Sequence, residues 1–331
     1  MHESQVGGAI VRVLKYLGGD RVQLIEVPPP VPAPGDVLVR VEASALCGSE
    51  RSALKSGVPD APHNAGHEAV GVIEAAPPDA ELMVGDRVGV SALAGCAVCP
   101  ACVSGNEQFC VRGVAIQTGM HAEFVSVTPA STRPIPRDAS ASVATLLVGD
   151  GLGVPVRALN RFPSEPGDRV IVLGLGPVGL SHVLVRAHAG ANVVTVEPSA
   201  FRRDLALRLG AVEVHESISD LAPAPLVIES TGIAAVVEDA FALCSPQGTV
   251  FQSGECGTIT VDASRDIVHR EIAYIGSWFY GRVDFPRMVE LYERGLRLDQ
   301  LITHAAAAED AQPVIDAFVG GRTGKVVFYW T

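Results

Sequence analysis

The chain has 331 residues, of which 48% are apolar and 19% charged, and its formal net charge is −12 at pH 7. This length indicates two folded domains more readily than one. The negative charge disfavours nonspecific binding to nucleic acid, and no basic stripe with interleaved aromatic residues offsets it. We therefore expect small molecules, and not nucleic acid, as partners.

The chain shows no sign of a membrane segment. Its first residues, MHESQVGGAIVRVL, lack a basic region followed by a cleavage site, so we expect no secretory signal and a cytoplasmic protein. The most apolar stretch, 170–185, is shorter than the about 20 residues that cross a bilayer and is interrupted by glycines and a proline. We therefore expect no contact with a membrane.

The first half of the chain alternates β-rich runs with loops rich in proline and glycine. The runs VLVRVEASAL (37–46) and AVGVIEAA (69–76) are typical of strands, and PPPVPAPGD (28–36) reads as an extended entry to the first of them. This half therefore predicts a mostly antiparallel β domain.

The pattern changes near residue 167. Short apolar strands are expected at 168–174, 191–197, 225–231 and 248–254, with helical segments at 199–211 and 234–244 between them. Strands that alternate with helices predict a parallel, doubly wound sheet, so the fold class is α/β. An amphipathic helix at 285–296 and a strand at 324–330 follow, and we expect this tail to return to the first domain.

Four of the seven cysteines stand in the spacing C-x2-C-x2-C-x7-C, at Cys96, Cys99, Cys102 and Cys110. Gaps of two residues let the sulfurs converge on one ion, and four thiolates without an open position form the closed pattern of structural zinc. Ferredoxin spacings differ from this one, so an iron–sulfur cluster or a redox role is the less favoured alternative. Any chemistry must then lie elsewhere.

The run VIVLGLGPVGLSHVLVRA reads strand, G-x-G-x-x-G, helix, which is the context of a dinucleotide-binding turn. Its first glycine permits a tight turn, its second lets a pyrophosphate approach the backbone, and its third lets helix pack on strand. Helix N–H groups then face the phosphates. The residues we assign to the turn are Gly174, Gly176, Pro177, Val178 and Gly179.

Glu197 ends the next expected strand, eighteen residues after Gly179. An acidic side chain there accepts hydrogen bonds from the adenosine ribose and repels a 2′-phosphate, so NAD is favoured over NADP. Arg202, which is able to screen such a phosphate, weakens this preference.

The order of motifs CGSE, GHE, VGDRV, the four cysteines and GLGPVG resembles the zinc-dependent medium-chain dehydrogenase/reductase family, in its alcohol, polyol and threonine dehydrogenase branch. The resemblance covers nearly the whole chain. It implies a GroES-like catalytic domain at 1–151 and 281–331 with a structural zinc lobe at about 95–111, a Rossmann domain at 152–280, and a homodimer or homotetramer.

The resemblance also implies a second, catalytic zinc. Cys47 and His67 match the family's ligands, Glu68 is the adjacent carboxylate that can approach the metal, and Ser49 matches the hydroxyl that hydrogen-bonds the substrate oxygen. Asp150 aligns with the last ligand, which relatives supply as Cys or Glu. Aspartate can ligate zinc, although an Asp-Gly turn without metal is the alternative.

Two further departures concern the neighbourhood of Cys47. The family's carboxylate that orients the ligand histidine is one methylene longer here, as Glu50, and a proton-relay histidine is replaced by Ser52. His121 lies in a segment that faces the cleft in relatives, or it is a surface histidine.

The function we expect is reversible oxidation of a secondary alcohol to a ketone by NAD, with two zinc ions per chain. A polyol, cyclitol or sugar-like alcohol is the first choice of substrate, and threonine or another amino alcohol the second. The alternative from a different class is an NAD-binding sensor or scaffold that has lost catalysis, because Glu50, Ser52 and Asp150 depart from the family pattern.

Overall fold

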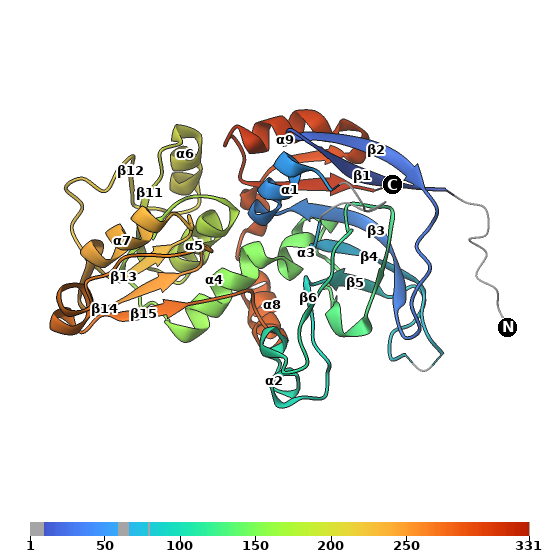
Figure 1. Cartoon of the computed structure of the whole chain (residues 1–331), viewed down its shortest axis with the longest axis horizontal. Coiled ribbons are helices and arrows are strands. Elements are labelled where there is room, and N and C mark those ends of the chain that lie inside the picture. The colour runs from blue at the N-terminus through green and yellow to red at the C-terminus, as the bar shows by residue number, and fades with distance from the viewer. Residues whose placement is uncertain (1–9, 59–65, 79, 331) are drawn as a thin grey trace.

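The computed structural model describes residues 10–58, 66–78 and 80–330. Within these residues the chain forms two larger sheets, which lie side by side with helices between them (Figure 1). One sheet is built from both ends of the chain and the other from its middle. The α/β fold class, with a GroES-like part and a Rossmann part, is confirmed.

The first sheet has the strand order β16-β17-β3-β4-β5-β9, with β8 paired to β3. Its pairings are antiparallel except that of β16 with β17. Its strands are β3 (Val37–Leu46), β4 (Ala69–Ala75), β5 (Arg87–Val90), β8 (Phe124–Val127), β9 (Thr132–Pro134), β16 (Ile302–Ala307) and β17 (Lys325–Tyr329). The chain therefore returns to this sheet at its C-terminal end.

Smaller elements surround the first sheet. Its apolar side is covered by the hairpin β1 (Val11–Gly18) and β2 (Arg21–Val27) and by α9 (Ala311–Val319), which share one buried cluster with β3 and β17. The cysteine segment carries β6 (Leu93–Ala94), α2 (Pro100–Val103) and β7 (Ala115–Ile116).

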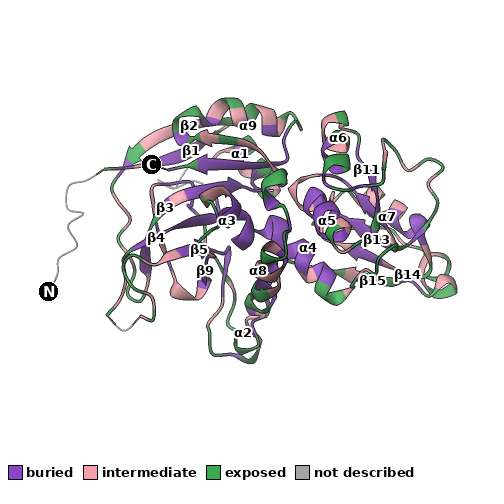
Figure 2. Cartoon of the chain, turned by 180° about the vertical axis from the view of Figure 1, so that it is seen from behind, coloured by how far each residue is buried: buried purple, intermediate pink, exposed green. Residues whose placement is uncertain are grey.

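The second sheet is parallel, with the strand order β12-β11-β10-β13-β14-β15. Its strands are β10 (Arg169–Leu173), β11 (Asn192–Val196), β12 (Glu213–His215), β13 (Ala224–Glu229), β14 (Cys244–Gln252) and β15 (Ala273–Gly276). Helices α5 (Pro177–His188), α6 (Ala200–Arg208) and α7 (Ala234–Leu243) connect them. Side chains alternate between two faces along a strand, so Val170 and Val172 join one buried cluster and Ile171 and Leu173 another. Figure 2 shows the central strands buried.

Two consecutive helices, α3 (Ala141–Val148) and α4 (Asp150–Arg161), lead from the first sheet to the second, and α8 (Phe285–Glu293) packs beside α4. Most residues of α3 and α4 are buried. Within the described ranges, no single helix has the length and hydropathy to cross a membrane; α3 and α4 pass that test only as a pair bent by 49°.

The predicted strands and helices at 37–46, 69–76, 168–174, 191–197, 199–211, 225–231, 234–244, 285–296 and 324–330 all form, with bounds that differ by a few residues at some ends. The run at 248–254 is the second half of a longer strand that starts at Cys244. The helices α3 and α4 were not predicted, because Gly149, Gly151, Gly153 and Pro155 obscure the helical period there.

Candidate active site and metal sites

Four side chains that can ligate a metal lie close together next to the first sheet. They are Cys47, His67, Glu68 and Asp150; all are buried, and their ligand atoms lie within 4.8 Å of one another. Cys47 follows β3, and His67 and Glu68 precede β4. Because β3 and β4 pair antiparallel with Ser44 opposite Ala69, the end of one strand lies beside the start of the other. Asp150 is the first residue of α4, which brings it to the same point.

The group contains polar atoms that the protein itself leaves without a hydrogen-bond partner. Within the described part of the chain these include Oδ1 of Asp150 and Oε1 of Glu68. His67 Nε2 lies 3.3 Å from Asp150 Oδ2. Burial raises the pKa of Asp150; burial lowers the pKa of His67, but contacts with Asp150 and Cys47 outweigh it and hold that pKa well above its usual value. Buried, unsatisfied N, O and S donors of this kind fit a zinc ion.

Glu68 is paired with Lys325 of β17, and both side chains are almost fully buried. Gly149 makes room for this carboxylate, because a Cβ added there would lie 2.7 Å from the Glu68 Cδ atom. A side chain at Gly149, the residue before Asp150, would therefore collide with the Glu68 carboxylate. The sequence alone did not single out Lys325; the one signal for it is that this lysine opens the apolar run KVVFYW.

Glu50 is buried next to this group. Its Oε1 accepts the backbone N–H of Cys47 at 2.9 Å, and its Oε2 accepts the Tyr16 hydroxyl at 2.8 Å and faces His121 Nε2 at 3.2 Å. Burial raises the pKa of the Glu50 carboxyl, but the facing imidazole of His121, the nearby His67 and the Cys47 N–H lower it to about 2. The Glu50 side chain, one methylene longer than the carboxylate of the family pattern, thus holds the backbone of Cys47 by a hydrogen bond.

The interpretation of His121 as a surface histidine is wrong. Its side chain is fully buried, with Nδ1 2.7 Å from Ser44 Oγ and the ring edge against Phe328. Ser49 is exposed beside Cys47 in the turn Gly48–Glu50, and Ser52 is exposed in α1 (Arg51–Ser56). Both hydroxyls therefore lie where solvent reaches them.

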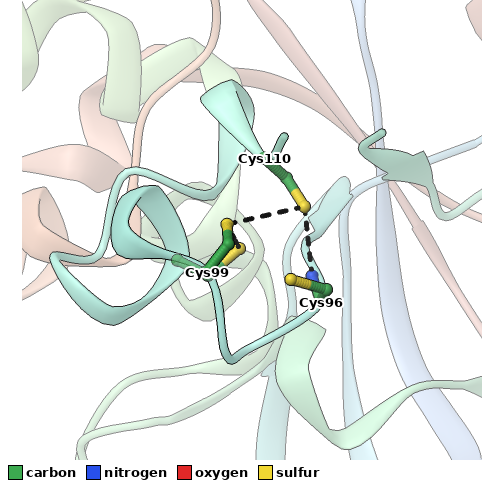
Figure 3. A group of neighbouring side chains, drawn as sticks. Cys96, Cys99 and Cys110 are labelled. Atoms are coloured by element: carbon green, nitrogen blue, oxygen red, sulfur yellow. Dashed lines mark hydrogen bonds between the residues drawn. The ribbon is translucent and has the colours of Figure 1, made fainter. Parts of the chain in front are cut away.

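The four cysteines of the second group also converge, with their sulfur atoms within 4.8 Å of one another. Figure 3 labels three of them, Cys96, Cys99 and Cys110. Cys99 Sγ lies 3.5 Å from Cys102 Sγ and 3.9 Å from Cys110 Sγ, distances far too long for a disulfide bond of about 2.05 Å. Backbone N–H groups of Cys102 and Val111 lower the pKa of Cys99 to about 6, which favours its thiolate. The geometry fits a closed four-thiolate metal cage.

This cysteine lobe is fixed to the rest of the protein by a buried ion pair between Glu107 and Arg133. Glu107 also accepts the backbone N–H of Arg282 at 2.9 Å, and the Arg282 guanidinium donates to the Cys102 carbonyl at 3.2 Å. The lobe therefore packs on the segment that returns from the parallel sheet.

The glycine-rich turn has the form that the motif predicts. Gly174 has φ +84°, and a Cβ on Gly179 would lie 1.9 Å from the Gly174 carbonyl oxygen, so only glycine fits either position. A Cβ on Gly176 would meet nothing within 4 Å. The middle of the turn is therefore open, and Pro177 and Val178 begin α5 just beyond it. This opening fits a pyrophosphate.

Glu197 follows β11 and is bound to the turn. Its carboxylate accepts the backbone N–H of Leu175 at 2.8 Å and of Ser199 at 3.0 Å. The Arg202 guanidinium lies 3.9 Å from it. Burial lowers the pKa of Arg202, an effect that Glu197 opposes. Glu197 and Arg202, the two residues expected to influence the choice between NAD and NADP, thus lie next to each other.

A cavity of about 440 Å³ lies at the carboxyl ends of β14 and β15. Gln252 and Gly276, the last residues of these strands, line it together with Trp278, while Phe109 of the cysteine lobe and Arg161 of α4 line its other side. In doubly wound sheets ligands bind outside the carboxyl ends of the strands, so the cavity and the glycine turn lie on the same, ligand-binding edge.

Two family models match the chain, and together they cover about two thirds of it. The alcohol dehydrogenase GroES-like domain matches residues 33–137, and the zinc-binding dehydrogenase domain matches residues 177–294. The chain belongs to the zinc-dependent medium-chain dehydrogenase family, and it is a dehydrogenase.

Among its relatives, the L-threonine 3-dehydrogenase of Pyrococcus horikoshii is 29% identical over 357 residues, covering 96% of this chain and 98% of the relative. An alcohol dehydrogenase of Escherichia coli CFT073 in complex with NADH superposes with a TM-score of 0.85 at 23% identity, covering 97% and 100% of the two chains. A zinc-binding dehydrogenase of Sinorhizobium meliloti 1021 bound to NADP gives 0.83 at 25% identity, covering 97% and 99%.

Proposed function

We propose that the protein is a zinc- and NAD-dependent dehydrogenase that interconverts a secondary alcohol and its ketone. The observation that carries the proposal is the convergence of Cys47, His67 and Asp150 in the interior, with Glu68 beside them. The family models agree with zinc-dependent redox chemistry.

Cys47, His67 and Asp150 would hold the catalytic zinc. Cys47 and Asp150 supply two negative charges and His67 none, so the donor set balances a dication. Glu68 is held by Lys325 and stays a neighbour of the metal, able to approach it and not a permanent ligand. Cys96, Cys99, Cys102 and Cys110 would hold the second, structural zinc.

The dinucleotide would lie across the carboxyl ends of the parallel strands. The strand order β11-β10-β13-β14 lets its adenosine rest near Glu197, its pyrophosphate at Gly176 and its nicotinamide toward β14 and the cavity. We favour NAD because the Glu197 carboxylate would repel a 2′-phosphate, whereas Arg202 would attract it. Of the two solved relatives above, one holds NADH and the other NADP, so the preference depends on these residues.

Bound zinc would supply Lewis acidity toward the hydroxyl oxygen, and bound NAD the hydride acceptor. The exposed Ser49 hydroxyl would hold the substrate hydroxyl, accept its proton and pass it to water, since no histidine stands at position 52. The turn at Gly176 and the buried ligand group would align the reactants.

The substrate is a polyol, cyclitol or sugar-like alcohol, or an amino alcohol. The second choice gains weight because three similar curated proteins, 26–29% identical to this chain over most of their length, are L-threonine 3-dehydrogenases. The exposed strand β15 lies at the edge of the parallel sheet, where the same strand of a second copy of the chain would pair with it and form a homodimer. Sedimentation analysis would test this assembly.

The test is to load purified protein with zinc, measure the metal content, and add NAD with a panel of polyols, cyclitols, L-threonine and simple alcohols. We expect two zinc ions per chain and absorbance of reduced cofactor with one substrate class. One zinc per chain, together with silence across the panel, would support the NAD-binding sensor or scaffold that has lost catalysis.

A further inference from the structure

A line of buried polar side chains runs from the C-terminal end of the chain to Cys47. Trp330 follows β17, Ser44 lies in β3, His121 precedes β8 and Glu50 ends the turn after Cys47. The indole Nε1 of Trp330 donates to Ser44 Oγ at 2.8 Å, and Ser44 Oγ lies 2.7 Å from His121 Nδ1. His121 Nε2 faces Glu50 Oε2 at 3.2 Å, and Glu50 Oε1 accepts the Cys47 N–H at 2.9 Å.

The donors of this line all point toward Glu50. An indole N–H can only donate, so Ser44 Oγ accepts from Trp330 and its own hydrogen is free to point at His121 Nδ1. With Nδ1 accepting from Ser44, a histidine hydrogen on Nε2 faces the carboxylate. In the other neutral tautomer a lone pair on Nε2 would face the oxygens of Glu50, which is unfavourable. The Glu50 carboxylate therefore favours the hydrogen on Nε2, and Trp330 supports this tautomer from a distance because it leaves the Ser44 hydrogen for Nδ1.

The His121 ring also touches the segment that carries the histidine of the ligand group. A Cβ added to Gly66 would lie 2.8 Å from the backbone N and from Cγ of His121, and Met120 N donates to the Gly66 carbonyl at 3.1 Å. Gly66 directly precedes His67. Phe328 meets the ring edge-on, at 5.4 Å between centroids, and so limits its rotation.

We propose that His121 is a positioning residue for the metal site: it holds Cys47 through Glu50 and His67 through Gly66. The inference rests on the proposed zinc site and adds to it a residue that does not itself bind the metal. Groups that orient metal ligands from behind change metal affinity by about 10- to 100-fold when they are removed. The longer carboxylate at Glu50 suits this arrangement, because it reaches both the Cys47 N–H and the buried imidazole.

Two substitutions separate the bond to Glu50 from the bond to Ser44. The amide nitrogen of glutamine falls near the place of His121 Nε2, so His121→Gln keeps a donor for Glu50. Asparagine reaches only the place of Nδ1, so His121→Asn loses that donor. The measurement is release of zinc from the whole protein to a chromogenic chelator, with the phase that disappears in Cys47→Ser assigned to the Cys47 site.

We expect His121→Asn to weaken zinc binding at the Cys47 site by about 10-fold or more and His121→Gln to stay within about 3-fold of the parent protein, with the cysteine-lobe phase unchanged in both. Trp330→Phe, which keeps the ring and removes its N–H, should weaken the same phase by less. Phe328→Leu is the control for packing, because it lowers the melting temperature without removing a hydrogen bond.

The outcomes distinguish this inference from the proposed function. Equal zinc affinity in His121→Asn, His121→Gln and the parent protein overturns the positioning role, as does a loss in Phe328→Leu as large as that in His121→Asn. If His121→Asn does not fold, Trp330→Phe decides in the same way. A parent protein with zinc in the cysteine lobe alone overturns the proposed function and the inference with it.

Discussion

The ammonium group of Lys325 forms an ion pair with the Glu68 carboxylate, and the two side chains are 3% and 0% exposed. The two residues are joined because β17, near the C-terminal end, pairs with β3, the strand that leads to Cys47. The cation beside Glu68 pairs with its carboxylate and holds it next to the ligand group.

Lys325→Met should therefore leave a buried carboxylate without its partner. We expect a loss of about 3–5 kcal/mol in the free energy of unfolding, measured by urea denaturation of the metal-free protein. The loss should be smaller with zinc bound, because Glu68 then has another cation to approach. The double variant Lys325→Met with Glu68→Gln is the control, and a double variant no more stable than Lys325→Met would contradict the explanation.

Asp150→Asn keeps the shape of the side chain and removes one of the two anionic ligands. We expect the zinc content to fall from two ions per chain to one and kcat/KM to fall by about 100-fold or more, since the remaining donors no longer balance a dication. Metal analysis and steady-state kinetics check this, with the cysteine lobe as an internal reference. Full zinc content in this variant would argue that Asp150 is not a ligand.

Glu197→Gln removes the negative charge that would oppose a 2′-phosphate and keeps an oxygen for the Leu175 N–H. We expect the ratio of kcat/KM for NADP to that for NAD to rise by about 10-fold, with Arg202 free to attract the phosphate. Arg202→Gln is the matched variant and should move the ratio the other way. An unchanged ratio in both would mean that other residues select the cofactor.

His182 lies fully buried in α5, and burial lowers its pKa well below the usual value. The imidazole is therefore neutral in the folded protein and takes up a proton on unfolding once the pH is below about 6.5. Since the unfolded chain then binds more protons, the free energy of unfolding decreases as the pH is lowered through that range. This group contributes up to about 1.4 kcal/mol per pH unit to the decrease. His182→Phe should flatten this fall in urea titrations between pH 7 and 5; an unchanged slope would refute it.

Local patterns predicted much of this protein. The spacing of the four cysteines, the turn around Gly174 and the strand at 37–46 are encoded over short stretches, because ligand convergence, a tight turn and side-chain alternation each depend on near neighbours. The resemblance also singled out Cys47, His67, Glu68 and Asp150, which the structure brings together.

Other features depended on where distant strands meet. Nothing local to KVVFYW indicates that Lys325 pairs with Glu68, and nothing local to His121 excludes a place on the surface, although its side chain is fully buried. Trp330 and Ser44 are 286 residues apart, and the antiparallel register of β17 on β3 brings them into contact.

The sequence by itself determined the two metal-binding donor sets as candidates, the dinucleotide turn and the fold class. The tertiary structure decided which buried groups stand behind the ligands, namely Lys325 behind Glu68, and Glu50 with His121 behind Cys47. The physical reason is that a buried charge or hydrogen bond depends on what the folded chain places within a few ångströms of it, and strand pairing sets that over the whole length of the chain.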